Sequence, residues 1–278
     1  MLKILNDIQP DKEVLDALAS YQKQINDLPT FDEKRAKAKE LFLARNKKGN
    51  RIFDAIKVSL LKISPGIERC AYCEDSQCDE VEHIYPKDLY PLFCFLWSNY
   101  VYACGICNGP KNNKFAIFRL DNGAFVEVNL NKNDKGELLP PPEGSTVFVN
   151  PREDEPLDFC RLDFLTFEFS IIAPKGTKEY IRADYTYNNV LRLNQREGLR
   201  ERRKNAFHDY KDRLNAYTLS KNLGKSQDKL DKMIQRLKTS DHPTVWKEMQ
   251  RQHTLGRLIK IDSDLDSLFQ QLPEALTW

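Results

Sequence analysis

Two Cys-x-x-Cys pairs are the residues whose type and spacing point most directly to chemistry. Cys70 pairs with Cys73 and Cys104 with Cys107, while residues 74–103 lie between the pairs. Four thiolates are the ligand set of a closed, tetrahedral structural Zn²⁺ site, and in a reducing compartment such pairs indicate metal rather than disulfides. The sequence therefore predicts a structural zinc ion on these four cysteines.

Three further cysteines complete an odd total of 7. Cys94 and Cys160 stand in apolar stretches, where a free thiol packs as a small hydrophobe, and we expect both in the core. Cys78 follows the first pair closely and is ambiguous, because it could be a substitute or an extra ligand. A redox role for the pairs would need one of them at a helix start in a βαβ setting, which the sequence does not show.

Between and after the pairs stand residues that a plain zinc knuckle does not explain. A strand-like run ends in Glu82 and His83, Asn99 precedes a second apolar strand, and Asn108 follows the last cysteine. Pro110 lies where a short helix could begin, since proline is favoured in the first helical turn. With its order of strand, loop, strand and helix, this segment resembles the HNH nuclease family and its ββα-metal core.

The resemblance implies a metal-dependent endonuclease. Hydrolysis of a phosphodiester needs a water deprotonated near neutral pH, and histidine, with an ordinary pKa of about 6.5, is the natural base. We therefore expect His83 to be the general base. By resemblance, Glu82 and Asn108 would hold one catalytic cation, and Asn99 would bond to backbone and hold the loop. Glu82 stands where Asp is commoner and Asn108 where His is commoner, and a neutral amide favours Mg²⁺ or Mn²⁺ over Ni²⁺ or Zn²⁺.

Lysines near this segment are candidate phosphate contacts. We expect Lys111 and Lys114 on the helix after Asn108, and Lys87 in the loop, where each could meet backbone phosphates. Lysines on a short exposed helix are usually only solvated, so each alone is a weak signal. The basic stretch 45–51 has the same two interpretations, a phosphate contact or a plain turn between helices.

A narrower resemblance covers about residues 60–215. The segments WSNYVYACGICNGPKNNK, VNPREDEPLDF and TYNNVLRLNQREGLRERR resemble the HNH subunit of Septu-type anti-phage defence systems, including those attached to retrons. The resemblance implies a partner ATPase that controls the nuclease, and the chain has no Gly-x-x-x-x-Gly-Lys-Ser/Thr loop that could supply this ATPase itself. The run REGLRERRK also suggests nucleic acid, but Glu197 and Glu201 are spaced for intrahelical pairing, which favours a solvated helix face.

The surrounding sequence predicts an α+β protein in which a small zinc-stapled ββα-metal core is embedded in mainly helical structure. Apolar spacing predicts three helices within 11–64, and further helices over 184–194 and 196–219. Short strands are expected in 145–150 and 163–173. We divide the chain into an N-terminal helical region for partner docking or basic contacts (1–65), the HNH core (66–122), and loops and strands followed by C-terminal helices (123–278).

Composition sets the wider limits. The chain has 278 residues, 41% hydrophobic and 30% charged, which predicts a folded protein. Its 43 basic and 41 acidic side chains leave a charge of +2, so attraction to nucleic acid must come from local patches. No stretch reaches the roughly 18 apolar residues of a membrane span, and the N-terminus lacks the regions of a signal peptide. We expect no membrane contact and a cytoplasmic protein.

Two functions remain after these exclusions. The first is a nuclease whose substrate is DNA, with RNA left open because metal-plus-histidine chemistry carries no signature of the sugar. The second is a non-catalytic zinc-binding adaptor for nucleic acid or protein on an HNH-like scaffold. The presence of Glu82, His83, Asn99 and Asn108 together favours the nuclease, because a degenerate scaffold has no reason to keep all four.

Overall fold

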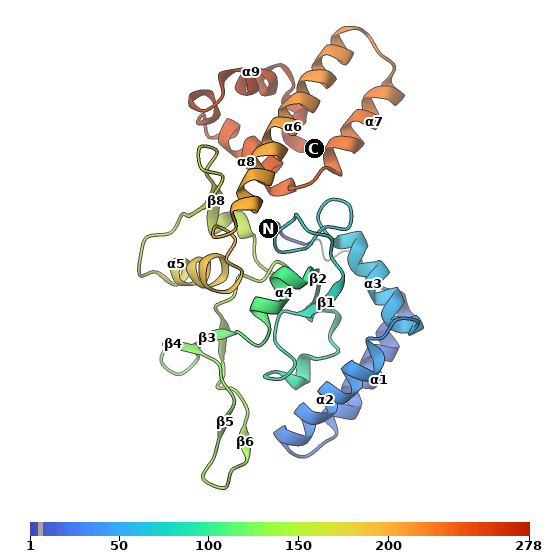
Figure 1. Ribbon diagram of the computed structural model, residues 1–278, viewed down its shortest axis with the longest axis vertical. Helices are drawn as coiled ribbons and strands as arrows, with labels where there is room; N and C mark the ends of the chain where they lie inside the picture. The colour runs from blue at the N-terminus through green and yellow to red at the C-terminus, as the bar shows by residue number, and fades with distance from the viewer. Residues whose placement is uncertain (5–7) are drawn as a thin grey trace.

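The chain begins with a helical region that follows its sequence signals. A computed structural model describes residues 1–4 and 8–278, and places here α1 (Lys12–Asn26), α2 (Phe31–Arg45) and α3 (Arg51–Ile63) (Figure 1). Helix α2 begins in a capping box, in which the side chain of Thr30 accepts from the backbone N–H of Glu33. The three helices expected within 11–64 are confirmed.

A hairpin followed by a short helix forms the centre of the molecule (Figure 1). Strands β1 (Glu80–His83) and β2 (Tyr100–Ala103) pair antiparallel, and α4 (Gly105–Lys111) follows. The loop between the strands contains the short 3₁₀ helices η1 (Pro91–Phe93) and η2 (Trp97–Asn99). The expected order of strand, loop, strand and helix is confirmed.

The start of α4 differs from the expectation. The helix begins at Gly105, so Pro110 lies inside it rather than at its start, and Lys114 lies beyond its end. The reason is local: the backbone N–H groups of Cys107 and Asn108 already bond to the carbonyl of Cys104, so the cysteine knuckle itself forms the first turn.

Short antiparallel sheets follow. Strands β3 (Ala116–Arg119), β4 (Phe125–Glu127) and β7 (Gly144–Thr146) form one sheet in the order β4-β3-β7. Two hairpins pair β5 (Asn131–Lys132) with β6 (Leu138–Leu139), and β8 (Cys160–Leu162) with β9 (Phe169–Ile171). A 3₁₀ helix, η3 (Pro156–Asp158), precedes β8. The strands expected in 145–150 and 163–173 therefore exist, but each is short.

The helix expected over 184–194 has a different form. Helix α5 (Lys178–Ala183) continues as the π-helix η4 (Asp184–Val190), which ends before Asn194. The Asn194 side chain instead bonds to the backbone N–H and carbonyl of Phe169. Tertiary contacts thus end the helix where the apolar pattern alone would extend it.

The next helix, α6 (Glu197–Asn222), confirms the prediction over 196–219. Its first turns, however, are not the solvated face we expected. Arg200 pairs with Glu168, and Arg203 is buried with its guanidinium over the ring of Phe169. These arginines attach α6 to the segment around β9.

The C-terminal helices gather around α6, at the opposite end of the molecule from the β5–β6 hairpin (Figure 1). They are α7 (Gln227–Lys238), α8 (Pro243–Thr254) and α9 (Ser263–Gln271), with the 3₁₀ helices η5 (Leu258–Lys260) and η6 (Pro273–Thr277). Among the described residues, no helix combines the length and apolar character needed to cross a bilayer.

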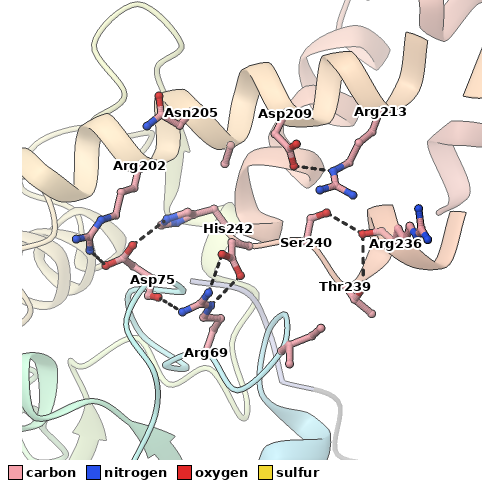
Figure 2. Close-up of a pocket in the computed structure, with 13 residues that line it drawn as sticks. Arg69, Asp75, Arg202, Asn205, Asp209, Arg213, Arg236, Thr239, Ser240 and His242 are labelled. Atoms are coloured by element: carbon pink, nitrogen blue, oxygen red, sulfur yellow. Dashed lines mark hydrogen bonds and ion pairs between the residues drawn. The ribbon is translucent and has the colours of Figure 1, made fainter. Parts of the chain in front are cut away.

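Ion pairs attach the C-terminal region to the loop that carries the first cysteine pair (Figure 2). Arg69 donates two hydrogen bonds to the carboxylate of Asp241, at 2.7 and 2.8 Å. Arg202 of α6 pairs with Asp75, and His242 Nε2 lies 3.4 Å from the same carboxylate. These side chains line a pocket of about 680 Å³ between the two regions.

Candidate functional site

The four cysteines of the two pairs converge in one buried group. Their Sγ atoms all lie within 4.8 Å of one another. Zn–S bonds of about 2.3 Å in tetrahedral geometry place the sulfurs about 3.8 Å apart, and the Sγ atoms of Cys73 and Cys104 are 3.8 Å apart. The group could therefore hold a zinc ion, as the sequence predicts.

The other three cysteines are buried as well. This confirms the packing role expected for Cys94 and Cys160. The four-sulfur group found among the described residues does not include Cys78. Burial raises the pKa of the Cys78 thiol to about 11, so this side chain stays a neutral thiol near pH 7.

A distant arginine contacts the cysteine group. Arg196, the residue before α6, donates an N–H to Cys107 Sγ at 3.6 Å, although the two residues are 89 positions apart. Four thiolates around Zn²⁺ carry a net charge of −2, which a guanidinium at this distance partly offsets. Sequence reasoning missed Arg196, because the run that contains it was interpreted as a solvated helix face.

Asn99 bonds to the backbone of the loop between β1 and β2. Its Oδ1 accepts from the backbone N–H of Tyr85 at 2.7 Å. Its Nδ2 donates to the carbonyls of Tyr85 at 3.0 Å and of Phe93 at 2.9 Å. One buried amide thus satisfies three backbone groups of the loop that leaves β1 immediately after His83.

His83 lies at the end of β1, opposite Tyr100 of β2, and is 4% exposed. Its Nε2 lies 2.9 Å from the carbonyl oxygen of Cys94. A carbonyl only accepts, so Nε2 carries the proton and Nδ1 is the basic nitrogen. Burial, together with the charge of Lys87, lowers the pKa of His83 to about 3, which keeps the ring neutral at pH 7. The Phe42 ring of α2 packs edge-on against it, with centroids 4.5 Å apart.

Glu82, the residue before His83, is buried in an ion pair with Lys111 of α4. The Lys111 ammonium also donates to the backbone carbonyl of His83 at 2.7 Å. Burial raises the pKa of the Glu82 carboxyl, although the charge of Lys111 opposes the shift. Lys111 was expected on the surface as a phosphate contact; that expectation is wrong, because its side chain is 0% exposed and holds α4 against β1.

Asn108 of α4 contacts a carboxylate that sequence reasoning missed. Its Nδ2 donates to Glu80 Oε2 at 2.5 Å. Glu80 and Glu82 are two positions apart on β1, so they face the same side of the strand. The spacing of Glu80 and Glu82 in the sequence already places both carboxylates on one face of a strand, and this signal could have identified Glu80. Because its nitrogen is committed to Glu80, Asn108 can offer its oxygen Oδ1 to a hard cation.

A pocket of about 600 Å³ brings these residues together, and we call it the histidine pocket. Its polar lining includes Glu80, Glu82, His83 and Asn108. Two cations, Lys57 of α3 and Lys87 of the loop after β1, also line it. Lys87, a candidate phosphate contact, thus lines this pocket, and its contact with phosphate stays a prediction. Lys114 is exposed and lines a neighbouring pocket instead.

Arg152 supports the hairpin from outside the nuclease-like segment. It is 2% exposed, and its Nε donates to the carbonyl of Tyr100 at 2.9 Å. Its guanidinium lies over the ring of Trp97, 4.8 Å from the centroid. Arg152 belongs to the VNPREDEPLDF segment. This segment supported the resemblance to the Septu subunit, but the sequence predicted no role for Arg152.

Fold and site together define an α+β protein in which a hairpin-helix unit carries a four-cysteine group beside a histidine pocket. A search of curated proteins found a similar segment: 61 residues are 43% identical to the Septu protein PtuB of Bacillus thuringiensis. The match covers 20% of this chain and 23% of that protein. No family model matches the chain, and no solved structure matches it.

Proposed function

We propose that this chain is an HNH-type endonuclease that hydrolyses phosphodiester bonds with a single divalent cation. The observation that carries the proposal is the orientation of His83. Its Nε2 is fixed on the Cys94 carbonyl, which leaves Nδ1 as the basic nitrogen of a ring that lines the same pocket as Glu82 and Asn108. His83 and Glu82 are neighbours on β1 and leave opposite sides of the strand, yet both border this pocket at the end of the strand.

The donor set of this pocket fits a hard cation. Glu82 offers a carboxylate and Asn108 an amide oxygen, and Glu80 stands beside them as a second carboxylate. Oxygen ligands of this kind suit Mg²⁺ or Mn²⁺. Such a cation, when bound, stabilises the charge that develops on the phosphate and the leaving oxygen.

The residues of the chain supply the remaining steps. His83 Nδ1 takes a proton from the attacking water; burial lowers the pKa of the free ring and weakens it as a base, and the Cys94 carbonyl counters this by stabilising the imidazolium through the Nε2–H bond. The hydroxyl of Tyr100 donates to the same carbonyl at 2.7 Å, which holds it in position. Lys57 and Lys87 attract the phosphodiester to the pocket. The zinc ion on the four cysteines has a structural role only.

The similarity to a Septu protein supports a place in anti-phage defence. We propose that the chain is the effector nuclease of such a system and that a partner ATPase controls it. DNA is the proposed substrate, and the cleavage test below also includes RNA. The similarity covers 20% of the chain. We propose that the helical region α1–α3 carries the contacts to the partner.

The test is cleavage of supercoiled plasmid and of total RNA by the full chain with Mg²⁺. The His83→Ala change should lower the cleavage rate by about 10²–10⁴-fold, because the base is lost, while bound zinc stays constant. His83→Gln keeps more of the buried volume and should show the same loss. His208→Ala, on an exposed face of α6, is the matched control. Undiminished cleavage by both His83 variants would refute the base assignment.

One observation favours a second candidate function, the non-catalytic adaptor. The Glu82 carboxylate already has a counterion in Lys111, so the pocket is electrically satisfied without a cation. An adaptor would bind zinc and retard nucleic acid in a mobility-shift assay, yet show no Mg²⁺-dependent cleavage. That combination of results would support the adaptor and exclude the nuclease.

A further inference from the structure

A second pocket lies directly beside the histidine pocket, and we call it the amide pocket. It has a volume of about 660 Å³ and lies between the end of α4, strand β4 and the π-helix η4. Gly109, Asn112 and Asn113 line both pockets. A polymer bound at His83 can therefore continue into the amide pocket over the end of α4 without leaving the protein surface.

Carboxamides are the most frequent polar groups in the lining of this pocket. Four asparagines contribute to it, namely Asn112, Asn113, Asn129 and Asn189. A carboxamide has two N–H donors and an acceptor oxygen, and although Nδ2 of Asn113, Asn129 and Asn189 already donates within the protein, the amide oxygens and remaining N–H groups can serve a ligand. The edges of nucleobases present the same mixture of donors and acceptors, and the carboxamide of asparagine can make paired hydrogen bonds to adenine. The lining is thus complementary to a base edge.

The charges of the two pockets differ in a way that separates base from phosphate. The charged residues in the lining of the amide pocket are Lys114 and Glu127, which have opposite signs. The histidine pocket holds Lys57 and Lys87, and it is also lined by the carboxylates of Asp79, Glu80 and Glu82. With the cation of the proposed function on these carboxylates, a phosphate suits the histidine pocket, whereas a neutral, polar base suits the balanced amide pocket.

The backbone around the amide pocket holds the amides in place. Asn189 lies on η4, and its Nδ2 donates to Asp184 Oδ2 at 3.1 Å. Asn113 Nδ2 donates to Asp88 Oδ2 at 3.0 Å. Asn112, at the end of α4, has a φ of 35°, a conformation uncommon for residues other than glycine. π-Helices are rare and often occur at functional sites, and groups ordered before binding cost less to order on binding.

We infer that the amide pocket receives the nucleobase next to the scissile phosphate and gives the nuclease a base preference at that position. The inference rests on the proposed function, because the histidine pocket must hold the phosphate. A base in this pocket has left its stack, which costs least in a single strand. The chain should therefore cut single strands and loops faster than duplex.

The test uses oligonucleotides with random sequence around the cut, as single-stranded DNA in one arm and RNA in the other. The full chain cleaves them with Mg²⁺, and sequencing of the new ends gives the base at each flanking position. We expect a preference of about 5- to 100-fold at one position next to the cut, the range for a well-paired base contact. The arm in which this base preference appears, DNA or RNA, shows which nucleic acid the pocket accepts.

Variants assign the preference to the pocket. Asn189→Ala and Asn129→Ala should each weaken it several-fold, and Asn129→Asp should change which base is preferred, because an amide donor becomes an acceptor. Asn215→Ala, on an exposed part of α6, is the matched control and should keep the wild-type preference. An oligonucleotide that is abasic at this position should remove the difference between the Asn129 variants and the wild type.

The outcomes separate this inference from the function on which it rests. A wild-type chain that cleaves without any flanking preference overturns the inference and leaves the nuclease standing. So does a preference that survives in all three asparagine variants while their melting temperatures match the wild type. A chain that cleaves neither DNA nor RNA overturns the nuclease, and the inference with it.

Discussion

The buried ion pair between Lys111 and Glu82 should contribute strongly to stability, and Lys111→Met tests this. The side chains are 0% and 7% exposed, so Met would leave a carboxylate with little access to water and no counterion. Removal of one partner from a buried pair costs about 3–5 kcal/mol. In a chain of this size each kcal/mol corresponds to about 2–4 °C in melting temperature, which predicts a fall of about 6–20 °C.

Scanning fluorimetry at pH 7 with zinc present measures this fall. Lys114→Met is the matched control, because Lys114 is exposed just beyond the end of α4 and should cost little. The double variant Glu82→Gln with Lys111→Met should melt higher than Lys111→Met alone, because no unpaired charge remains. A fall of less than about 2 °C, or a double variant no better than the single, would refute the argument.

The same variant connects stability with the proposed cation. In Lys111→Met the Glu82 carboxylate lacks its counterion, so a cation bound there stabilises the folded state by mass action. Titration with Mg²⁺ should raise the melting temperature of Lys111→Met more than that of Glu82→Gln. Equal responses of the two variants would show that Glu82 is not a cation ligand.

Three further predictions concern the loop, the cysteine group and the C-terminal helices. Asn99→Ala should cost about 2–3 kcal/mol in urea unfolding, because buried backbone groups lose their partners. Arg196→Met should lower zinc affinity, measured by chelator competition, by about 10–100-fold, because Cys107 loses its charged hydrogen bond. Burial raises the pKa of Asp262, but its hydrogen bonds to Lys211 and to backbone N–H groups, together with the charge of Lys211, outweigh burial and lower this pKa. The ionised Asp262 should thus contribute to the free energy of unfolding above about pH 4, and this contribution should be lost as the pH falls through the pKa of Asp262 in the folded state. Asp262→Asn should therefore flatten the plot of melting temperature against pH in this range.

Elements with strong local signals were predictable. The breaks between α1, α2 and α3 coincide with turn residues and caps, such as the Thr30 capping box, which act within a few positions along the chain. The π-helix η4 was not predictable in this way. Its form and its end depend on contacts such as that of Asn194 with Phe169, which lies 25 positions away.

In the candidate site, too, the features set by local sequence were predictable and those set by tertiary contacts were not. The two cysteine pairs and the order of Glu82, His83, Asn99 and Asn108 are close in sequence, so spacing alone located the unit that carries them. Spacing could not show that Lys111 would turn inward, because an exposed lysine and a buried, paired one look alike in a short helix.

The sequence by itself determined the two cysteine pairs, the hairpin-helix unit and the identity of the proposed base, because each depends on residue types within one short segment. Only the tertiary structure decided the surroundings of that base. Phe42 covers His83 from α2, and Arg196 reaches Cys107 from the start of α6. Burial and ion pairing depend on which distant segments pack together, and no local pattern in this chain records that choice.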